Sequence, residues 1–349
     1  MNVRLKPLDR QTIVIAGAAS GIGLTTARMA AEAGARVVPV ARDEQALSSF
    51  QTRMTERGHD VAYFVADVTD ADALAEVVDF AVERFGGIDT WVNCAGVGMF
   101  GRAMDISLED ARRLVDIDFW GQVHGSRTAI DYVQQREPNG YGFALINIGS
   151  VESDRAVPLH SFYSASKHAL KGFTDALRME LEEAGLPVSV TLIKPGPIDT
   201  PFVQHALNLM DKEGSFPPPV YAPELVGEAI LHAARYPRRD LVVGGGGWLI
   251  SRVGLLAPRL ADRLMRRTFF KMQQQDAPPE RKHALRSPGN AGGNERGSYP
   301  GTVRNTSLYT SAQLHPKAVQ FALAAVGVAA AIFLTSGSRT RSTASLTKG

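Results

Sequence analysis

The chain of 349 residues contains one cysteine, Cys94, and has little excess charge. A single cysteine excludes an internal disulfide and is typical of a reducing compartment, so we expect a cytoplasmic protein. A formal net charge of +2, without a zinc module or a basic recognition helix, argues against a nucleic-acid-binding protein. No His, Cys, Asp and Glu residues have the spacing of metal ligands, so we expect no metal. No long apolar run precedes the first strand-like segment, so a cleaved secretory signal is not expected.

Short apolar runs alternate with longer amphipathic stretches along most of the chain. The strand-like runs are 12–17, 35–41, 61–67, 88–96, 143–150, 188–196 and 240–245, and the helical stretches are 22–33, 43–57, 70–85, 107–135 and 162–184. β-branched runs that are apolar on both faces indicate strands covered by helices on each side. The alternation predicts an α/β fold, a doubly wound parallel sheet of Rossmann type with helices on both faces. Such sheets bind ligands beyond the carboxyl ends of their strands.

The chain divides into four predicted parts. Residues 1–247 form the catalytic domain, in which the proline-rich stretch 197–222 is expected to be a mobile flap over the site. Residues 248–275 form a basic amphipathic helical extension, interrupted at Pro258. Residues 276–316 are rich in Pro, Gly, Asn and Ser and predict a disordered linker. Residues 317–335 predict an apolar C-terminal helix.

The C-terminal region carries two weak membrane signals. The uncharged stretch 318–334 is at the lower length limit for a membrane span. The extension 248–275 contains six basic residues and one acid among apolar side chains, a composition that binds anionic membrane surfaces. We therefore expect the tail to attach the protein to a membrane. The alternative is that the tail is a helix that docks on the body or on a partner subunit.

A glycine-rich turn follows the first strand-like run. The segment AGAASGIG places Gly17, Gly21 and Gly23 between that run and a helical stretch. Glycines permit a tight turn and let backbone N–H groups approach a pyrophosphate at a helix N-terminus. Alone, the spacing could mark only a strand-to-helix turn, but its position between a strand and a helix is the context of a dinucleotide-binding motif.

A tyrosine and a lysine, Tyr163 and Lys167, stand four positions apart in a helical stretch, and Ser150 ends the fifth strand-like run. Four residues is just over one helical turn, so the two side chains point the same way, and a nearby cation favours the phenolate. By itself the pair could be a surface pair. With the glycine turn and the segments VADVTD, VNCAG and KPGPIDT, however, the chain resembles the short-chain dehydrogenase/reductase family over residues 8–245.

The resemblance implies a catalytic triad of Ser150, Tyr163 and Lys167. Tyr163 would exchange a proton with a carbonyl or alcohol oxygen. Lys167 would lower the tyrosine pKa and hold the nicotinamide ribose, and Ser150 would hydrogen-bond the reacting oxygen. The family has a fourth catalytic residue, an Asn, and Asp118 stands in that place here. Asp118 could accept the same hydrogen bonds and favour a charged Lys167, or it could weaken proton relay.

The same resemblance implies a set of cofactor-binding residues. They are Gly17, Ser20, Gly21, Ile22, Gly23, Asp67, Val68, Asn93, Ala95, Gly96, Tyr163, Lys167, Pro195, Ile198 and Thr200. Arg42 follows the second strand, where an acidic residue would select NAD. A guanidinium matches a 2′-phosphate, so NADP(H) is favoured over NAD(H); otherwise Arg42 is an ordinary surface arginine.

The sequence therefore predicts an NADP(H)-dependent oxidoreductase that interconverts a carbonyl and an alcohol. Apolar residues in the flap favour a small apolar substrate, and His205 in the flap is a candidate substrate contact. The resemblance also implies a homodimer or homotetramer that pairs through the long helices carrying Asp118 and Tyr163. The alternative is a catalytically weak cofactor-binding scaffold or redox-sensing protein, with Asp118 as a sign of decay. We assign no chemical role to His160 or His168.

Overall fold

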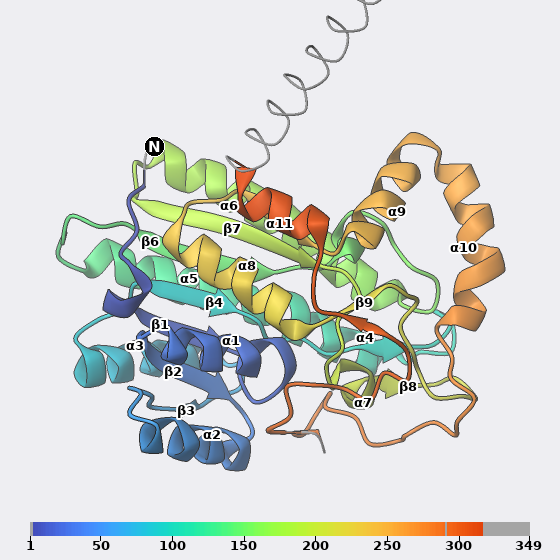
Figure 1. Ribbon diagram of the computed structural model, residues 1–349, viewed down its shortest axis with the longest axis horizontal. Helices are drawn as coiled ribbons and strands as arrows, with labels where there is room; N and C mark the ends of the chain where they lie inside the picture. Colours follow the sequence, from blue (N-terminus) through green and yellow to red (C-terminus); the bar gives the residue numbers. More distant parts are fainter. Residues whose placement is uncertain (1–2, 290–291, 317–349) are drawn as a thin grey trace, which may run out of the picture.

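The computed structural model describes residues 3–289 and 292–316. A parallel sheet of seven strands runs through it in the order β10-β7-β6-β4-β1-β2-β3 (Figure 1). Their bounds are β1 (Thr12–Ala16), β2 (Arg36–Ala41), β3 (Phe64–Val65), β4 (Thr90–Asn93), β6 (Phe143–Ile148), β7 (Val188–Pro195) and β10 (Asp240–Val243). The predicted doubly wound sheet is confirmed. The chain reverses its direction across the sheet between β1 and β4, which is where such folds bind ligands.

Helices cover both faces of the sheet, as the apolar strands require. Ile13 and Ile15 of β1 pack into the core beneath α1 (Gly21–Glu32), α2 (Glu44–Glu56) and α8 (Pro223–Arg235). Val14 and Ala16 pack into the core beneath α3 (Ala71–Phe85), α5 (Gly121–Gln135) and α6 (Ser161–Glu183). Successive side chains of one strand thus enter opposite cores, and neither face can be left in water.

The long helix predicted over 107–135 is interrupted in the middle. It consists of α4 (Leu108–Val115), one π-helical turn η2 (Asp116–Trp120) and α5. Asp118 lies in the π turn and is fully buried. Such a turn widens the helix locally and often occurs at functional sites.

The predicted flap is tied to the body at several points. It contains α7 (Phe202–His205), β8 (Leu207–Asn208) and β9 (Val220–Tyr221), and β8 pairs with β5 (Met99–Phe100). The Leu207 N–H donates to the Gly98 carbonyl over 3.1 Å, and the Leu209 N–H donates to the Phe100 carbonyl over 2.8 Å.

The basic extension forms a helical hairpin of α9 (Gly245–Leu256) and α10 (Pro258–Met272), and the break at Pro258 is confirmed. The hairpin stands at one end of the molecule (Figure 1). Here α9 packs against η3 (Val151–Ser153), the short 3₁₀ turn that follows β6.

The segment predicted to be a disordered linker instead packs on the body where it is described. Its elements are β11 (Val303–Arg304), which pairs with β9, and α11 (Leu308–Leu314). The Gln313 side chain makes two hydrogen bonds to the backbone of Val242, of 3.1 and 2.8 Å. The composition was misleading because this segment needs no core of its own: the body supplies partners for its backbone. The predicted apolar helix over 317–335 lies outside the described residues. In the part that is described, no helix is long and apolar enough to cross a membrane.

Candidate active site

A cavity of about 540 Å³ opens at the carboxyl edge of the sheet, beside the reversal point between β1 and β4. Its walls come from the loop after β1, the segment after β6, α6, the flap and the α9–α10 hairpin. Of the residues predicted to bind cofactor or to act in catalysis, most line this one cavity: Gly17, Ser20, Gly21, Ile22, Gly23, Arg42, Asp67, Val68, Ala95, Gly96, Ser150, Tyr163, Lys167, Pro195, Ile198 and Thr200.

The glycine turn leaves no room for side chains. Gly17 has φ of +95°, and a Cβ there would lie 2.4 Å from the Ala95 nitrogen. A Cβ on Gly23 would lie 2.0 Å from the Gly17 carbonyl oxygen. Both positions therefore require glycine, and the turn brings the N-terminus of α1 to the cavity wall. This geometry fits a pyrophosphate held by backbone N–H groups.

Arg42 lies on the same wall, and two of its guanidinium nitrogens contact protein groups there. Its Nη2 donates to the Ala284 carbonyl over 2.6 Å, and its Nη1 lies 3.6 Å from the Asp67 Oδ2. Within residues 3–289 and 292–316, the buried Nη1 has no hydrogen-bond partner. The Asp67 Oδ2 also accepts a hydrogen bond from the Arg113 Nη2 over 2.8 Å. The Arg42 Nη1 is a donor that fits a phosphate group of a nucleotide.

The segment after residue 283 runs across the cofactor-binding side of the cavity. We call residues 284–289 and 292–299 the strap. The Gly293 N–H donates to the Ala19 carbonyl over 2.8 Å, and the Gly21 N–H donates to the Asn294 carbonyl over 2.9 Å. Glu295 holds Arg28 of α1 through hydrogen bonds of 2.7 and 2.8 Å. The sequence predicts a free linker here, whereas the strap forms part of the cavity wall. It adds Ala284, Pro288, Gly289 and Gly292 to the cavity lining.

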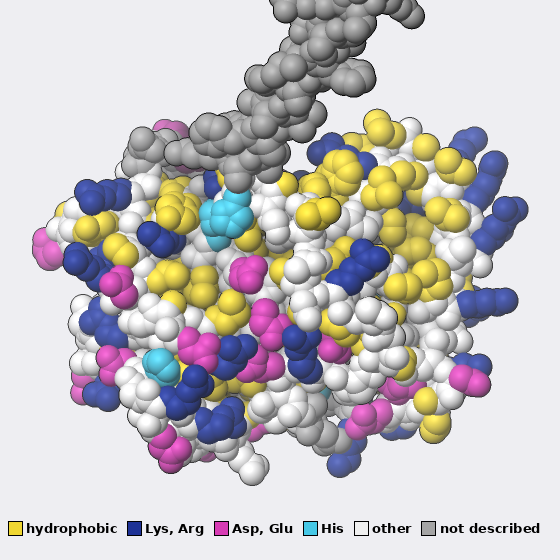
Figure 2. Space-filling view, in the orientation of Figure 1, with side chains coloured by type: hydrophobic (Ala, Val, Ile, Leu, Met, Phe, Trp, Pro, Cys, Tyr) yellow, Lys and Arg dark blue, Asp and Glu magenta, His cyan; other side chains and the backbone are white. Residues whose placement is uncertain are grey.

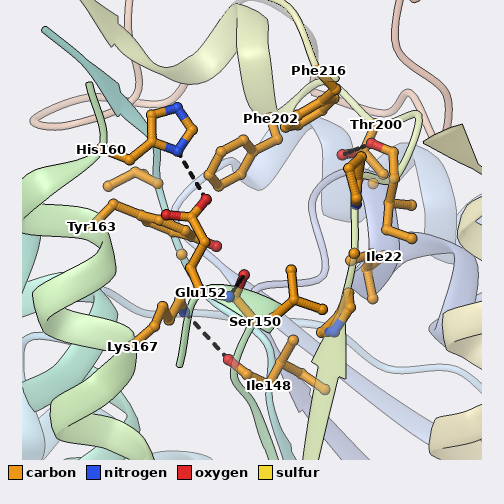
Figure 3. A pocket seen from close by; sticks show the side chains of 18 of the residues that line it. Ile22, Ile148, Ser150, Glu152, His160, Tyr163, Lys167, Thr200, Phe202 and Phe216 are labelled. Atoms are coloured by element: carbon orange, nitrogen blue, oxygen red, sulfur yellow. Dashed lines mark hydrogen bonds and ion pairs between the residues drawn. The ribbon is translucent and has the colours of Figure 1, made fainter. Parts of the chain in front are cut away.

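Tyr163 and Lys167 project from one side of α6 toward Ser150 (Figure 3). The Lys167 Nζ lies 5.5 Å from the centre of the Tyr163 ring and donates to the Ile148 carbonyl over 3.2 Å. Ser150 follows the last residue of β6 by two positions and caps η3, since its hydroxyl accepts the Glu152 N–H over 3.1 Å. The strand end and the helix thus bring together three groups separated by up to seventeen positions in the chain.

Asp118 lies behind Lys167 and not on the cavity wall. Its Oδ1 accepts the Val97 N–H over 2.8 Å, and its Oδ2 lies 3.5 Å from the Lys167 Nζ. Burial raises the pKa of Asp118, while Lys167 and the Val97 N–H act in the opposite direction. Because Asp118 replaces the family's Asn, an ionisable carboxyl group lies directly beside Lys167.

The pKa of Tyr163 is raised well above its ordinary value, contrary to the expectation that Lys167 lowers it. Burial is the main cause, followed by the negative charges of Glu152 and Asp118; the Ser150 hydroxyl acts in the opposite direction. Asp118 lies beside Lys167, so its negative charge opposes the effect of the lysine charge on the pKa of Tyr163. The neutral Asn of the family would not oppose that effect.

A buried polar group next to Tyr163 was missed by sequence reasoning. The Glu152 Oε1 lies 2.9 Å from the His160 Nδ1, and its Oε2 accepts the Ser164 hydroxyl over 2.5 Å. The His160 ring meets the Tyr163 ring edge to face, with centroids 5.9 Å apart. The only available signal was the position of Glu152, two residues after Ser150.

His205 lines the cavity as a flap residue, and its carbonyl accepts the Ala284 N–H of the strap over 2.8 Å.

Asn93 is not among the residues that line the cavity, and its contact with the cofactor stays a prediction. It is the last residue of β4 and is fully buried, and its amide group donates to the Gln122 carbonyl, Ser126 Oγ and Asn147 Oδ1. Its Oδ1 accepts the Trp91 indole N–H over 2.8 Å. Asn93 therefore ties β4 to β6 and α5. Cys94 does line the cavity, and burial raises the pKa of its thiol to about 12, so the thiol stays neutral.

The far end of the cavity is apolar. Phe202 packs against the Tyr163 ring with centroids 5.4 Å apart and stacks on Phe216 at 6.0 Å. The α9–α10 hairpin closes this end with Ile250, Val253, Met265 and Phe269, among others. In the described part of the chain, no group of His, Cys, Asp and Glu could hold a metal ion.

This chain belongs to the short-chain dehydrogenase family, because the family model of that description matches residues 11–210. It is similar to YxnA of Bacillus subtilis, an uncharacterized oxidoreductase, at 45% identity over 317 residues, 90% of this chain and 88% of YxnA. It is 37% identical to the 11-beta-hydroxysteroid dehydrogenase A of Sesamum indicum over 198 residues, 56% of this chain and 54% of that protein.

Among solved structures, the alcohol dehydrogenase of the archaeon Thermococcus sibiricus, complexed with 5-hydroxy-NADP, has a TM-score of 0.57 at 24% identity. The match covers 67% of this chain and 95% of that one, and it shows the same fold. The family and its oxidoreductases establish an NAD(P)-dependent dehydrogenase or reductase. The YxnA match spans so much of the chain that it includes most of the segment after residue 247.

Proposed function

We propose that the protein is an NADP(H)-dependent oxidoreductase that interconverts a carbonyl and an alcohol on an apolar substrate, with Tyr163 as the general acid and base. The observation that carries this proposal is the convergence of Tyr163, Lys167 and Ser150 in the same cavity as the glycine turn. When bound, the nicotinamide cofactor supplies or accepts the hydride, and the protein's own residues handle the proton and the oxygen.

In the direction of reduction, Tyr163 donates its phenolic proton to the carbonyl oxygen. Its raised pKa keeps it protonated at neutral pH, which suits a proton donor. Ser150 hydrogen-bonds the same oxygen and stabilises the charge that develops on it. Lys167 holds the ribose hydroxyls of the cofactor, and Asp118 holds Lys167 in place through the 3.5 Å contact.

For the cofactor, the turn of Gly17, Gly21 and Gly23 would cradle the pyrophosphate, with the Gly21 N–H here donating to the Asn294 carbonyl of the strap. Asp67 and Val68 would hold the adenine, and Ile198 and Thr200 would hold the nicotinamide amide. Arg42 supports the preference for NADP(H), because it places a cation on the cofactor wall and its Nη1, which is ion-paired with Asp67 over 3.6 Å, makes no hydrogen bond to the described residues. The solved neighbour was complexed with 5-hydroxy-NADP, which agrees with this preference.

The apolar end of the cavity supports the substrate class. Phe202 and Phe216 from the flap and Met265 and Phe269 from the hairpin offer contact surface without charge. Burying an apolar substrate there is favourable in proportion to the area removed from water. The relative from Sesamum indicum is named as a hydroxysteroid dehydrogenase, which is consistent with an apolar polycyclic or long-chain carbonyl.

We also infer a cytoplasmic homodimer or homotetramer that pairs through the helices carrying Asp118 and Tyr163. Trp120 in the π turn and Met179 in α6 are exposed apolar side chains on these helices. Light scattering should give the mass of two or four chains, and the mass of one chain would contradict the inference.

The test of the function is NADPH oxidation with a panel of aldehydes and ketones, comparing wild type with Tyr163→Phe. We expect turnover on apolar members of the panel and a loss on the order of 10²-fold or more in the variant, with cofactor binding retained. Tight NADPH binding without turnover across the panel would instead identify a cofactor-binding scaffold. A variant as active as wild type would show that Tyr163 is not the acid.

A further inference from the structure

The outer face of the α9–α10 hairpin is unusually apolar for a surface. Its exposed leucines are Leu249, Leu255, Leu256, Leu260 and Leu264. Leu255 and Leu256 are 72% and 82% exposed, at the turn between the two helices. Figure 2 shows apolar side chains gathered over α9 and α10. Single exposed leucines are ordinary, whereas a contiguous group on one protruding hairpin marks a contact surface.

Basic side chains surround this apolar group. The hairpin carries six of them, Arg252, Arg259, Arg263, Arg266, Arg267 and Lys271, against the single acid Asp262. Asp262 is already paired with Arg155 of the body. None of the six forms an ion pair with any residue in 3–289 or 292–316, and Figure 2 shows basic side chains projecting at the outer rim. The hairpin is thus more positive than the whole chain at +2, so the rest of the protein is net acidic.

The apolar surface continues into the cavity. Ala261, Met265 and Phe269 form the buried side of α10, and Met265 and Phe269 line the substrate end of the cavity. Leu249 and Leu264 line the cavity and are also exposed to solvent, so they stand at its mouth. A path of apolar side chains therefore leads from the outside of the hairpin to the ring of Phe202 beside Tyr163.

We propose that the α9–α10 hairpin docks on an anionic lipid surface and that the apolar substrate enters the cavity from that surface, between Leu249 and Leu264. Leucines at the hairpin turn bury in the boundary between headgroups and acyl chains, and the surrounding arginines contact anionic headgroups. The charge of the hairpin selects this partner: a bare apolar patch would suit a second copy, but six unpaired cations would repel the same six on that copy. The part of the proposal that concerns entry rests on the proposed function.

The direct test uses the full chain with an environment-sensitive dye on an introduced cysteine. Cys94 lines the cavity, so the cysteines are introduced into a Cys94→Ser background and the dye reacts only at the new site. Leu256→Cys reports from the hairpin turn, and Val82→Cys on α3 is the matched control on an exposed apolar position. Vesicles of phosphatidylcholine with phosphatidylglycerol should shift the emission of the dye at 256 to the blue and leave the dye at 82 unchanged.

Three outcomes would overturn the docking proposal. The dye at 256 could stay in water although the protein binds the vesicles, which would assign binding to another part of the chain. It could respond equally to vesicles without phosphatidylglycerol, which would remove the role of the basic rim. It could shift with protein concentration and no vesicles, which would identify a second copy as the partner.

Variants separate the two contributions to docking. Leu255→Ser with Leu256→Ser and, separately, Arg263→Glu with Arg267→Glu should each weaken binding to the anionic vesicles on the order of tenfold or more, because one removes insertion and the other reverses attraction. Arg53→Glu with Arg84→Glu reverses the same number of exposed charges on α2 and α3 and should leave binding unchanged. Only the arginine variant should reduce the dependence of binding on salt.

Turnover separates a failure of this proposal from a failure of the proposed function. With NADPH, wild type should reduce both propanal in water and dodecanal dissolved in the anionic vesicles. The Leu255→Ser, Leu256→Ser variant should keep propanal turnover and lose most dodecanal turnover. If wild type reduces neither aldehyde, the proposed function fails. If wild type and variant reduce dodecanal in vesicles equally well, the function stands and entry from the lipid surface is wrong.

Discussion

Replacing Arg42 by alanine should weaken the binding of NADPH and leave the binding of NADH nearly unchanged. The structure limits how large the effect can be. Nη2 of Arg42 already donates to the Ala284 carbonyl and Nη1 is ion-paired with Asp67 without a hydrogen bond, so we count one new charge-assisted hydrogen bond, from Nη1 to a 2′-phosphate. One charge-assisted hydrogen bond contributes about 1.5–3 kcal/mol. This corresponds to roughly ten- to hundredfold in the dissociation constant of NADPH.

The assay is a fluorescence titration of each cofactor against wild type, Arg42→Ala and Arg53→Ala. Arg53 is an exposed arginine of α2, so its replacement removes the same charge without touching the cofactor wall. Equal losses for NADPH and NADH would show that Arg42 supports the wall and does not read the phosphate. A loss of NADPH binding in Arg53→Ala as large as in Arg42→Ala would show that only overall charge matters.

Three further predictions concern the same cavity. Lys167→Ala should lower both turnover and cofactor affinity, because the ammonium serves the proton donor and the ribose; unchanged affinity would contradict the ribose contact. Asp118→Asn removes a negative charge that raises the pKa of Tyr163. In the pH profile of kcat/KM for alcohol oxidation, the rise that reports deprotonation of Tyr163 should therefore move to lower pH. A profile that stays in place would mean that Asp118 is uncharged. Gly23→Ala should lower Tm by the equivalent of about 1–3 kcal/mol and abolish stabilisation by NADPH, since its Cβ would meet the Gly17 carbonyl.

The catalytic site illustrates what local sequence can predict. Tyr163 and Lys167 are separated by just over one helical turn, and Ser150 ends a strand, so the helical repeat and the strand direction predict where these groups point. The glycine turn is also predictable from local sequence, because a backbone such as that of Gly17, with a positive φ and no room for a Cβ, requires glycine. The cavity lining agrees with these assignments, and the seven predicted strands all occur in the sheet.

Other parts of the site depend on contacts between residues distant in the chain. Asn93 matches the family motif, yet its side chain faces a buried network with Asn147 and Ser126, because β6 and α5 happen to offer partners there. The strap was misread because its composition cannot form a core, while the body offers Ala19, Gly21 and Arg42 as hydrogen-bond partners.

The sequence by itself determined the parallel sheet, the glycine turn and the helical spacing of Tyr163 and Lys167, because each follows from the repeat of one strand or one helix. Only the tertiary structure decided that Glu152 and His160 lie against Tyr163. It likewise decided that a basic helical hairpin forms the wall of the substrate cavity. These depend on how separate elements pack, and burial then changes the pKa of Tyr163 in a direction that no local pattern contains.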